Sequence, residues 1–229
     1  MKKFILLISL PILAIAVALG SFIYILDIMG LGTPTAASPA VKPLPVLSNK
    51  NTAPPPAATK LLIAMPIADA LSRVTKKPFG LYVTPNFSPV KPERFTGYHT
   101  GVDFETTPGE RDIDVPIFAI CPGKILIKKT ASGYGGVVNE SCMIAGQAVT
   151  VTYGHLRLAS IAKKVGQTLS QGEQIGVLGT GYSTETDGER KHLHLGIHKG
   201  AAAVITGYVA TKAQLAPWIN AMDYLAPKK

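Results

Sequence analysis

The sequence has few cysteines, few aromatic residues and few charges. Phe, Trp and Tyr make up 7% of its 229 residues, and Asp, Glu, Lys and Arg together 16%. Its two cysteines, Cys121 and Cys142, are too few for a disulfide-built scaffold and too far apart for a CxxC site. No cluster of Lys and Arg is interleaved with aromatic residues. We therefore exclude a disulfide framework and expect no nucleic-acid partner.

Acidic residues are also scarce, which leaves the chain strongly basic. Its 23 Lys and Arg against 14 Asp and Glu give a formal net charge of +9. Such a charge favours anionic surroundings, such as a phospholipid surface or an acidic cell-wall polymer. The alternative is that the charge only keeps the protein soluble beside a negative surface.

The beginning of the chain has the composition of a membrane anchor. Lys2 and Lys3 precede an uncharged, mainly apolar run over residues 4–26, and Asp27 is the next charge. At ~1.5 Å per residue this run spans the roughly 30 Å hydrocarbon layer, and it exceeds the ~7–15 apolar residues of a cleavable signal peptide. We predict a single-pass transmembrane helix over residues 1–27, with a signal peptide as the alternative. The lysine pair indicates that the rest of the chain lies outside the cytoplasm.

The next segment, residues 28–60, is rich in proline and alanine and poor in large apolar residues. Such a composition cannot bury enough apolar surface to offset the entropy lost on ordering. We predict a disordered linker that holds a folded domain, residues 61–229, away from the membrane.

That domain is predicted to be mostly β. Short runs of β-branched and apolar residues alternate with turn-forming Gly and Pro pairs, at residues 115–120, 123–129, 136–144, 147–156, 174–181 and 191–200. Their near-regular spacing indicates an antiparallel sheet or sandwich. Residues 61–74 fit a helix or a strand equally well, and residues 214–225 fit a terminal helix or an irregular cap.

All five histidines fall in this β-rich part, four of them in three short motifs. The motifs are GYHTGVDFE (His99 and Asp103), TYGHL (His155) and KHLHL (His192 and His194), and His198 follows the last of them. Side chains alternate along a strand, so His192 and His194 point to the same face. Two imidazoles on one face, together with a separate His-x-x-x-Asp pair, indicate a shared site.

These motifs, in this order, resemble the lysostaphin-type zinc endopeptidases, the family that includes the LytM-like cell-wall hydrolases. The likeness covers roughly residues 79–199 and includes PIFAICPGK, GYGGV and VGQTLSQGEQIGVLGTGYST. It implies that His99, Asp103 and His194 bind Zn²⁺ and leave a fourth position open, as catalytic zinc sites do. No other cofactor is expected.

The resemblance also implies which residues act beside the metal. His155 and His192 share two tasks, accepting a proton from water and either stabilising the oxyanion or protonating the leaving amine. His198 receives no role and is expected at the surface or the rim of the site.

The implied function is hydrolysis of peptide cross-links or stems of bacterial peptidoglycan by a zinc endopeptidase anchored in the cytoplasmic membrane. One alternative is a catalytically inactive relative that binds wall peptides or activates another hydrolase, but the presence of all five site residues argues against it. A zinc carboxypeptidase of stem peptides is the other alternative. The oligomeric state is not constrained.

Two segments are longer than the family pattern. Residues 184–191, before the last histidine pair, include Glu185, Asp187, Glu189, Arg190 and Lys191. We expect them to form a mobile, solvated loop at the mouth of the cleft, with a role in restricting which peptides enter as the alternative. The other segment, residues 106–116, is expected to form a further wall.

The two cysteines are predicted to pair. If the strands on either side of Ser132 and Gly133 form a hairpin, residues whose numbers sum to about 263 lie opposite each other, and Cys121 and Cys142 meet this condition. An exported domain permits the bond. The alternative is two unpaired thiols.

Overall fold

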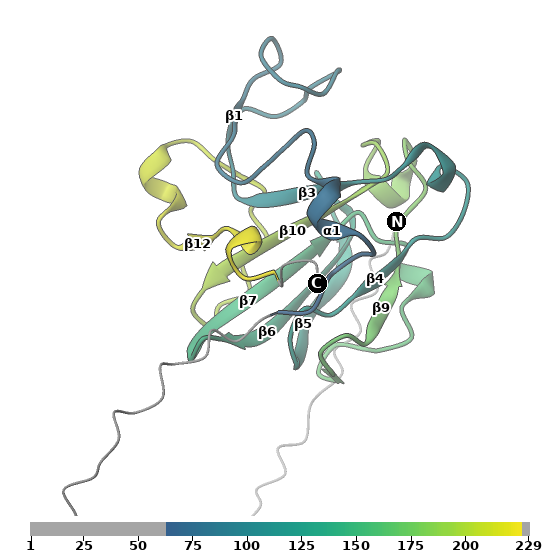
Figure 1. Ribbon diagram of the computed structural model, residues 1–229, viewed down its shortest axis with the longest axis vertical. Helices are drawn as coiled ribbons and strands as arrows, with labels where there is room; N and C mark the ends of the chain where they lie inside the picture. Colours follow the sequence, from purple (N-terminus) through teal and green to yellow (C-terminus); the bar gives the residue numbers. More distant parts are fainter. Residues whose placement is uncertain (1–62, 226–229) are drawn as a thin grey trace, which may run out of the picture. The chain divides into compact units, whose positions relative to one another are not determined.

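The structure, a computed structural model, describes residues 63–225, which are built mainly of antiparallel strands (Figure 1). The predicted anchor and linker, residues 1–27 and 28–60, lie outside the described residues. Within residues 63–225, no helix has the length and apolar character needed to cross a membrane.

The main sheet has seven strands in the order β12-β10-β7-β6-β5-β8, with β3 also paired to β10. The bounds are β3 Gly101–Glu105, β5 Gly123–Ala131, β6 Gly135–Ile144, β7 Gln147–Gly154, β8 Thr168–Leu169, β10 His192–Lys199 and β12 Trp218–Ile219. In Figure 1, β5, β6, β7 and β10 run side by side through the centre of the fold. The predicted antiparallel sheet is confirmed.

Two smaller sheets flank this one. One contains β1 Tyr82–Val83, β2 Gly97–His99 and β11 Tyr208–Val209, and the other β4 Pro116–Phe118 and β9 Gln174–Val177. All six predicted runs contain a strand, namely β4, β5, β6, β7, β9 and β10.

The helical elements are short. Residues 61–74 contribute one turn of helix, α1 Ala70–Arg73, which packs beside β3. The 3-10 turns are Pro108–Glu110, Leu158–Ser160, Thr184–Thr186, Lys212–Leu215 and Ala221–Asp223. Residues 214–225 therefore form the irregular cap, with β12 between the last two turns.

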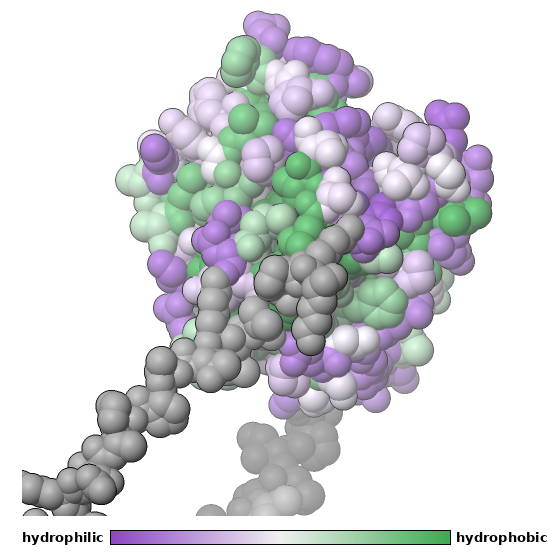
Figure 2. All heavy atoms as spheres, in the orientation of Figure 1, coloured by the Kyte–Doolittle hydropathy of each residue, from purple (hydrophilic) through white to green (hydrophobic). Residues whose placement is uncertain are grey.

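Strand β10 separates the core from the polar face that carries the histidines. Leu193, Leu195 and Ile197 are fully buried in the core, whereas His192 and His194 point to the other face and line a cavity. Each buried aliphatic side chain contributes roughly 1.5–3 kcal/mol, so the core holds the strand firmly in register. Figure 2 shows hydrophobic residues near the middle of one face and hydrophilic ones along its edges.

The structure joins Cys121 and Cys142 in a disulfide, with their Cα atoms 6.1 Å apart. The strand register differs from the predicted one, because the numbers of paired residues sum to 266 from Ala131–Gly135 to Ile127–Asn139 (131 + 135 and 127 + 139) and, past a bulge, to 265 at Ile125–Glu140 (125 + 140), instead of about 263. Cys121 lies in the bend before β5, and it reaches Cys142 on β6 from there.

Strand β6 carries a buried carboxyl group, that of Glu140. Glu140 is fully buried, and the Tyr153 hydroxyl donates to its Oε1 at 2.6 Å. Its Oε2 has no hydrogen-bond partner among the described residues. Burial raises the pKa of Glu140 to about 8. The hydrogen bond from Tyr153 lowers this pKa, and the negative charge of Glu173 raises it, but both effects are smaller than that of burial. The carboxyl group is therefore protonated at neutral pH.

Glu140→Gln is expected to stabilise the fold increasingly as the pH rises from about 4.5 to about 8. In this window the folded wild-type chain keeps a proton that the unfolded chain releases, so unfolding becomes easier by at most about 1.4 kcal/mol per pH unit. The glutamine variant lacks this proton. Urea unfolding of both chains at pH 5 and pH 8 measures the difference, and an equal free-energy gap at the two pH values would contradict the assignment.

Candidate active site

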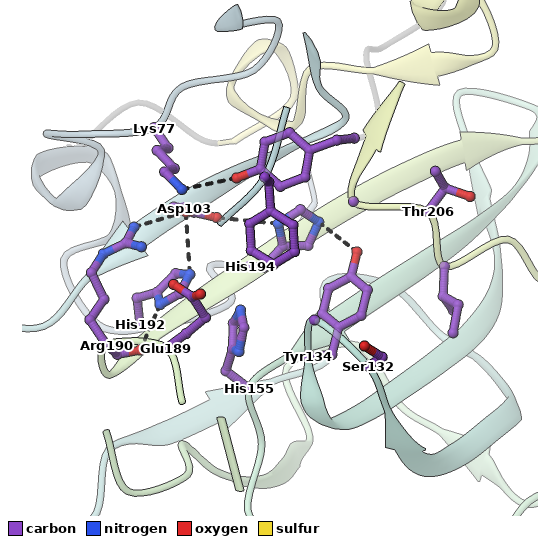
Figure 3. A pocket seen from close by; sticks show the side chains of 15 residues that line it. Lys77, Asp103, Ser132, Tyr134, His155, Glu189, Arg190, His192, His194 and Thr206 are labelled. Carbon is purple, nitrogen blue, oxygen red and sulfur yellow. Dashed lines mark hydrogen bonds and ion pairs between the residues drawn. The ribbon is translucent and has the colours of Figure 1, made fainter. Parts of the chain in front are cut away.

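The five predicted site residues come together from four strands. His99 ends β2, Asp103 lies within β3, His192 and His194 begin β10, and His155 directly follows β7. All five are at most 4% exposed. His99 is fully buried, and the other four line a cavity of about 290 Å³ (Figure 3).

Strand pairing places the central two residues next to each other. In the antiparallel β10–β3 pair, His194 stands directly opposite Asp103, and across β7 it faces Gly154. A Cβ atom on Gly101 would lie 2.7 Å from the His194 ring, and one on Gly154 would lie 2.4 Å from the Tyr134 ring. Glycine at these two positions lets the rings of His194 and Tyr134 approach the sheet.

Three ligand atoms face one another at this point. His99 Nε2 lies 3.0 Å from His194 Nδ1, and Asp103 Oδ1 lies 3.2 Å from each of these nitrogens. His99 Nδ1 donates to the Pro78 carbonyl at 3.2 Å, so the Nε2 atom of His99 carries no proton and has a free lone pair. The tautomer in which His194 Nε2 donates to the Tyr134 hydroxyl, at 3.3 Å, likewise leaves Nδ1 free.

This donor set fits a zinc ion. Two imidazole lone pairs and a carboxylate oxygen all need a positive partner, and a single proton cannot satisfy the three. A tetrahedral zinc ion with bonds of ~2.0–2.1 Å places its ligand atoms roughly 3.3 Å apart, close to the separations seen here. His99, Asp103 and His194 are thus the residues that could hold the metal.

The second oxygen of Asp103 is held separately. Arg190 Nη2 donates to Oδ2 at 2.8 Å, and His192 Nε2 lies 3.2 Å from the same oxygen. Burial on its own would raise the pKa of Asp103, but the neighbouring His192, His99 and His194 outweigh it and hold this pKa well below its usual range. The carboxylate is therefore ionised, and its orientation leaves Oδ1 for the metal.

His194 is held in the unprotonated form that metal binding requires. Burial lowers its pKa to about 4, and this effect outweighs the hydrogen bond to Asp103, which raises the pKa. A neutral imidazole at working pH needs no proton removed before it binds a metal ion.

His155 and His192 pack against each other in the same cavity, with their ring centroids 4.2 Å apart and their planes tilted by 39°. His192 Nδ1 donates to the Arg190 carbonyl at 2.8 Å. His155 Nδ1 is buried and has no hydrogen-bond partner among the described residues. Burial, together with the His192 charge, lowers the pKa of His155 well below its usual range. The His155 imidazole is therefore neutral, and it lies in the cavity with an unpaired nitrogen, the position that a proton acceptor needs.

The backbone at His155 has an unusual conformation. Its φ is +64°, in the left-handed region that few non-glycine residues adopt. The Gly179 N–H donates to the His155 carbonyl at 2.8 Å and helps to hold this turn. Strained backbone of this kind is concentrated at functional sites.

The expectation of a solvated loop at residues 184–191 is wrong for its last part. Glu189 and Arg190 are each only 7% exposed, and both line the cavity. Glu189 pairs with Arg94 at 2.9 Å, and the Asp187 carboxylate accepts from the Gly133 N–H at 2.8 Å. Ion pairs and hydrogen bonds to distant parts of the chain therefore fold this segment onto the site.

Sequence reasoning missed several residues of the cavity wall, namely Lys77, Phe95, Tyr134, Arg190 and Tyr208. Tyr134 belongs to the GYGGV segment, so the resemblance could have identified it. Nothing around Lys77 marks it in the sequence. His198 lies outside this cavity lining and packs edge-on against Trp218, with ring centroids 4.8 Å apart.

Comparisons with known proteins agree with the sequence resemblance. The profile of peptidase family M23 matches residues 97–206, which include all five histidines and Asp103. No curated protein sequence gives a significant match.

Among solved structures, this chain matches the catalytic domain of the antimicrobial peptidase lysostaphin from Staphylococcus simulans. The two are 22% identical over 70% of this chain and 98% of that one, with a TM-score of 0.46. Csd3 from Helicobacter pylori is 21% identical over 74% of this chain, with a TM-score of 0.44, and the match spans about a third, 34%, of the Csd3 chain. A zinc-containing peptidase from Vibrio cholerae is 20% identical over 63% of this chain and 39% of its own, with a TM-score of 0.41.

Proposed function

We propose that this chain, which belongs to peptidase family M23, is a zinc-dependent endopeptidase that hydrolyses peptide cross-links or stems of bacterial peptidoglycan. One observation carries the proposal. Three buried ligand atoms, from His99, Asp103 and His194, face one another at 3.0–3.2 Å, with two further imidazoles in the same cavity. Three protein ligands beside an accessible cavity are typical of catalytic zinc sites, whereas structural sites are closed by four.

Held by His99, Asp103 and His194, a zinc ion would lower the pKa of a bound water towards ~7 and would polarise the scissile carbonyl. The chain's own residues handle the protons. His155 is neutral and has an unpaired nitrogen, and His192 is oriented by its bond to the Arg190 carbonyl. These two imidazoles share the roles of general base and of donor to the developing oxyanion or the leaving amine.

The setting that we propose is the outer side of the cytoplasmic membrane. The apolar N-terminal segment would anchor the chain as a single-pass protein, and the proline-rich segment would let the domain reach the wall. The net charge of +9 favours a location beside an anionic polymer such as the cell wall. Peptidoglycan peptides and the membrane are therefore the proposed partners.

Incubation of the full chain in detergent with purified sacculi tests this function. We expect soluble peptides to be released, 1,10-phenanthroline to stop the release, and added zinc to restore it. Mass spectrometry separates the reactions: conversion of cross-linked dimers to monomers indicates an endopeptidase, and loss of one terminal residue indicates a carboxypeptidase. Binding to sacculi with no product at any zinc concentration would identify an inactive wall-binding relative instead.

A further inference from the structure

A second cavity, of about 470 Å³, adjoins the active site, and Arg190 lines both. One part of its wall comes from residues 105–108, 111 and 112, and another from residues 180–182, 190 and 191. These walls come largely from the two segments that exceed the family pattern. The cavity is therefore an elaboration of this chain and is not part of the common frame that holds the metal ligands.

The lining of the second cavity is basic. Its cationic side chains are Lys76, Arg111, Arg190 and Lys191, and its acidic side chains are Glu105 and Asp112. The lining therefore has an excess of two positive charges (4 − 2). Glu105 is already bound by Arg190 through two of its nitrogens. The Lys191 ammonium donates only to backbone carbonyl groups, and within residues 63–225 the Arg111 guanidinium makes no ion pair. The cavity thus favours an anion.

Arg190 connects this cavity to the catalytic residues. Its Nη2 donates to Asp103 Oδ2 at 2.8 Å and its Nε to Glu105 Oε2 at 2.9 Å. Its Nη1 is buried and lacks a hydrogen-bond partner among the described residues. An unpaired buried donor of this kind is costly, and a carboxylate is the acceptor that guanidinium geometry matches best.

We propose that the second cavity binds a free carboxylate of the peptide substrate. The guanidinium groups of Arg190 and Arg111, which both line this cavity, recognise the carboxylate while the scissile bond lies over the metal ligands. The inference rests on the proposed function in that its ligand is the peptide to be hydrolysed. It makes the charged segments 106–112 and 184–191 determinants of specificity, because they select stems that carry an unmodified carboxylate over amidated ones.

Binding to a hydrolysis-deficient chain tests this directly. The full His155→Ala chain, loaded with zinc, is titrated by calorimetry with two synthetic stem peptides that differ only in free carboxylates or carboxamides. We expect the free-acid peptide to bind about tenfold more tightly, the effect of one charge-assisted contact. Addition of Arg111→Gln should reduce this preference to below about twofold, and Arg190→Gln should do the same.

Lys212→Gln is the matched control, because it removes one positive charge outside both cavities. It should keep the full preference. Arg111 does not touch Asp103, so its variant tests the cavity even if Arg190→Gln fails to fold. Equal affinities for the two peptides, or a preference unchanged by Arg111→Gln, would overturn the inference. A carboxylate preference in binding without hydrolysis by the wild-type chain would count against the proposed function alone and support this inference.

Discussion

Replacing His194 with alanine is expected to abolish both zinc retention and peptide hydrolysis. Its Nδ1 lies 3.0 Å from His99 Nε2 and 3.2 Å from Asp103 Oδ1, so its loss leaves only two of the three ligand atoms. Metal binding by a remaining imidazole and carboxylate is far weaker, since catalytic zinc sites rely on three protein ligands. Zinc content after dialysis, measured by mass spectrometry, should fall from a full equivalent to background.

The matched control for this variant lies on the same strand. His198 is on the same face of β10, but it packs against Trp218 and lies outside the lining of the cavity. His198→Ala should retain zinc and activity, which separates loss of a ligand from a general effect of changing β10. Full zinc occupancy in folded His194→Ala would show that the metal binds elsewhere.

The fold was predictable where β-branched and apolar residues form runs of strand length bounded by turn-forming residues. The six runs of this kind contain strands β4, β5, β6, β7, β9 and β10. Strands β1, β8, β11 and β12 have two residues each, too few for any periodicity, and they exist because a neighbouring strand supplies their hydrogen bonds. Strand pairing was not predictable either, because β10 pairs with β3, about ninety residues away, through tertiary packing.

Motifs identified the members of the candidate site, but not how they are held. Strand alternation placed His192 and His194 on one face, and the resemblance supplied the rest. The charges of residues 184–191 suggested a solvated loop, since a charged run without visible partners is usually exposed. Arg190 finds Asp103 and Glu105 some 85–87 positions earlier in the chain. Only the folded chain shows that the charges of Glu189 and Arg190 are paired and buried.

His155→Ala, in contrast to His194→Ala, is expected to keep zinc and lose activity. The His155 ring packs against His192, and its nitrogens are not among the three facing ligand atoms, so the metal should remain. Loss of a positioned proton acceptor typically costs about 10²–10⁴-fold in rate. Zinc analysis and the rate of peptide release from sacculi, measured on the same preparation, test both halves of the prediction.

The backbone at His155 calls for a second variant. At φ +64° any residue with a Cβ atom, His155 included, is strained by about 1–2 kcal/mol. Alanine lacks the ring that packs against Tyr134 and His192, so in His155→Ala a distorted turn must be separated from the loss of the imidazole. Asparagine tolerates this left-handed conformation but has no basic nitrogen at working pH. His155→Asn should therefore preserve the turn and the zinc while remaining inactive. Near-wild-type rates in His155→Asn would show that the His155 imidazole is not the proton acceptor, and zinc-free protein from both variants would make His155 a metal ligand.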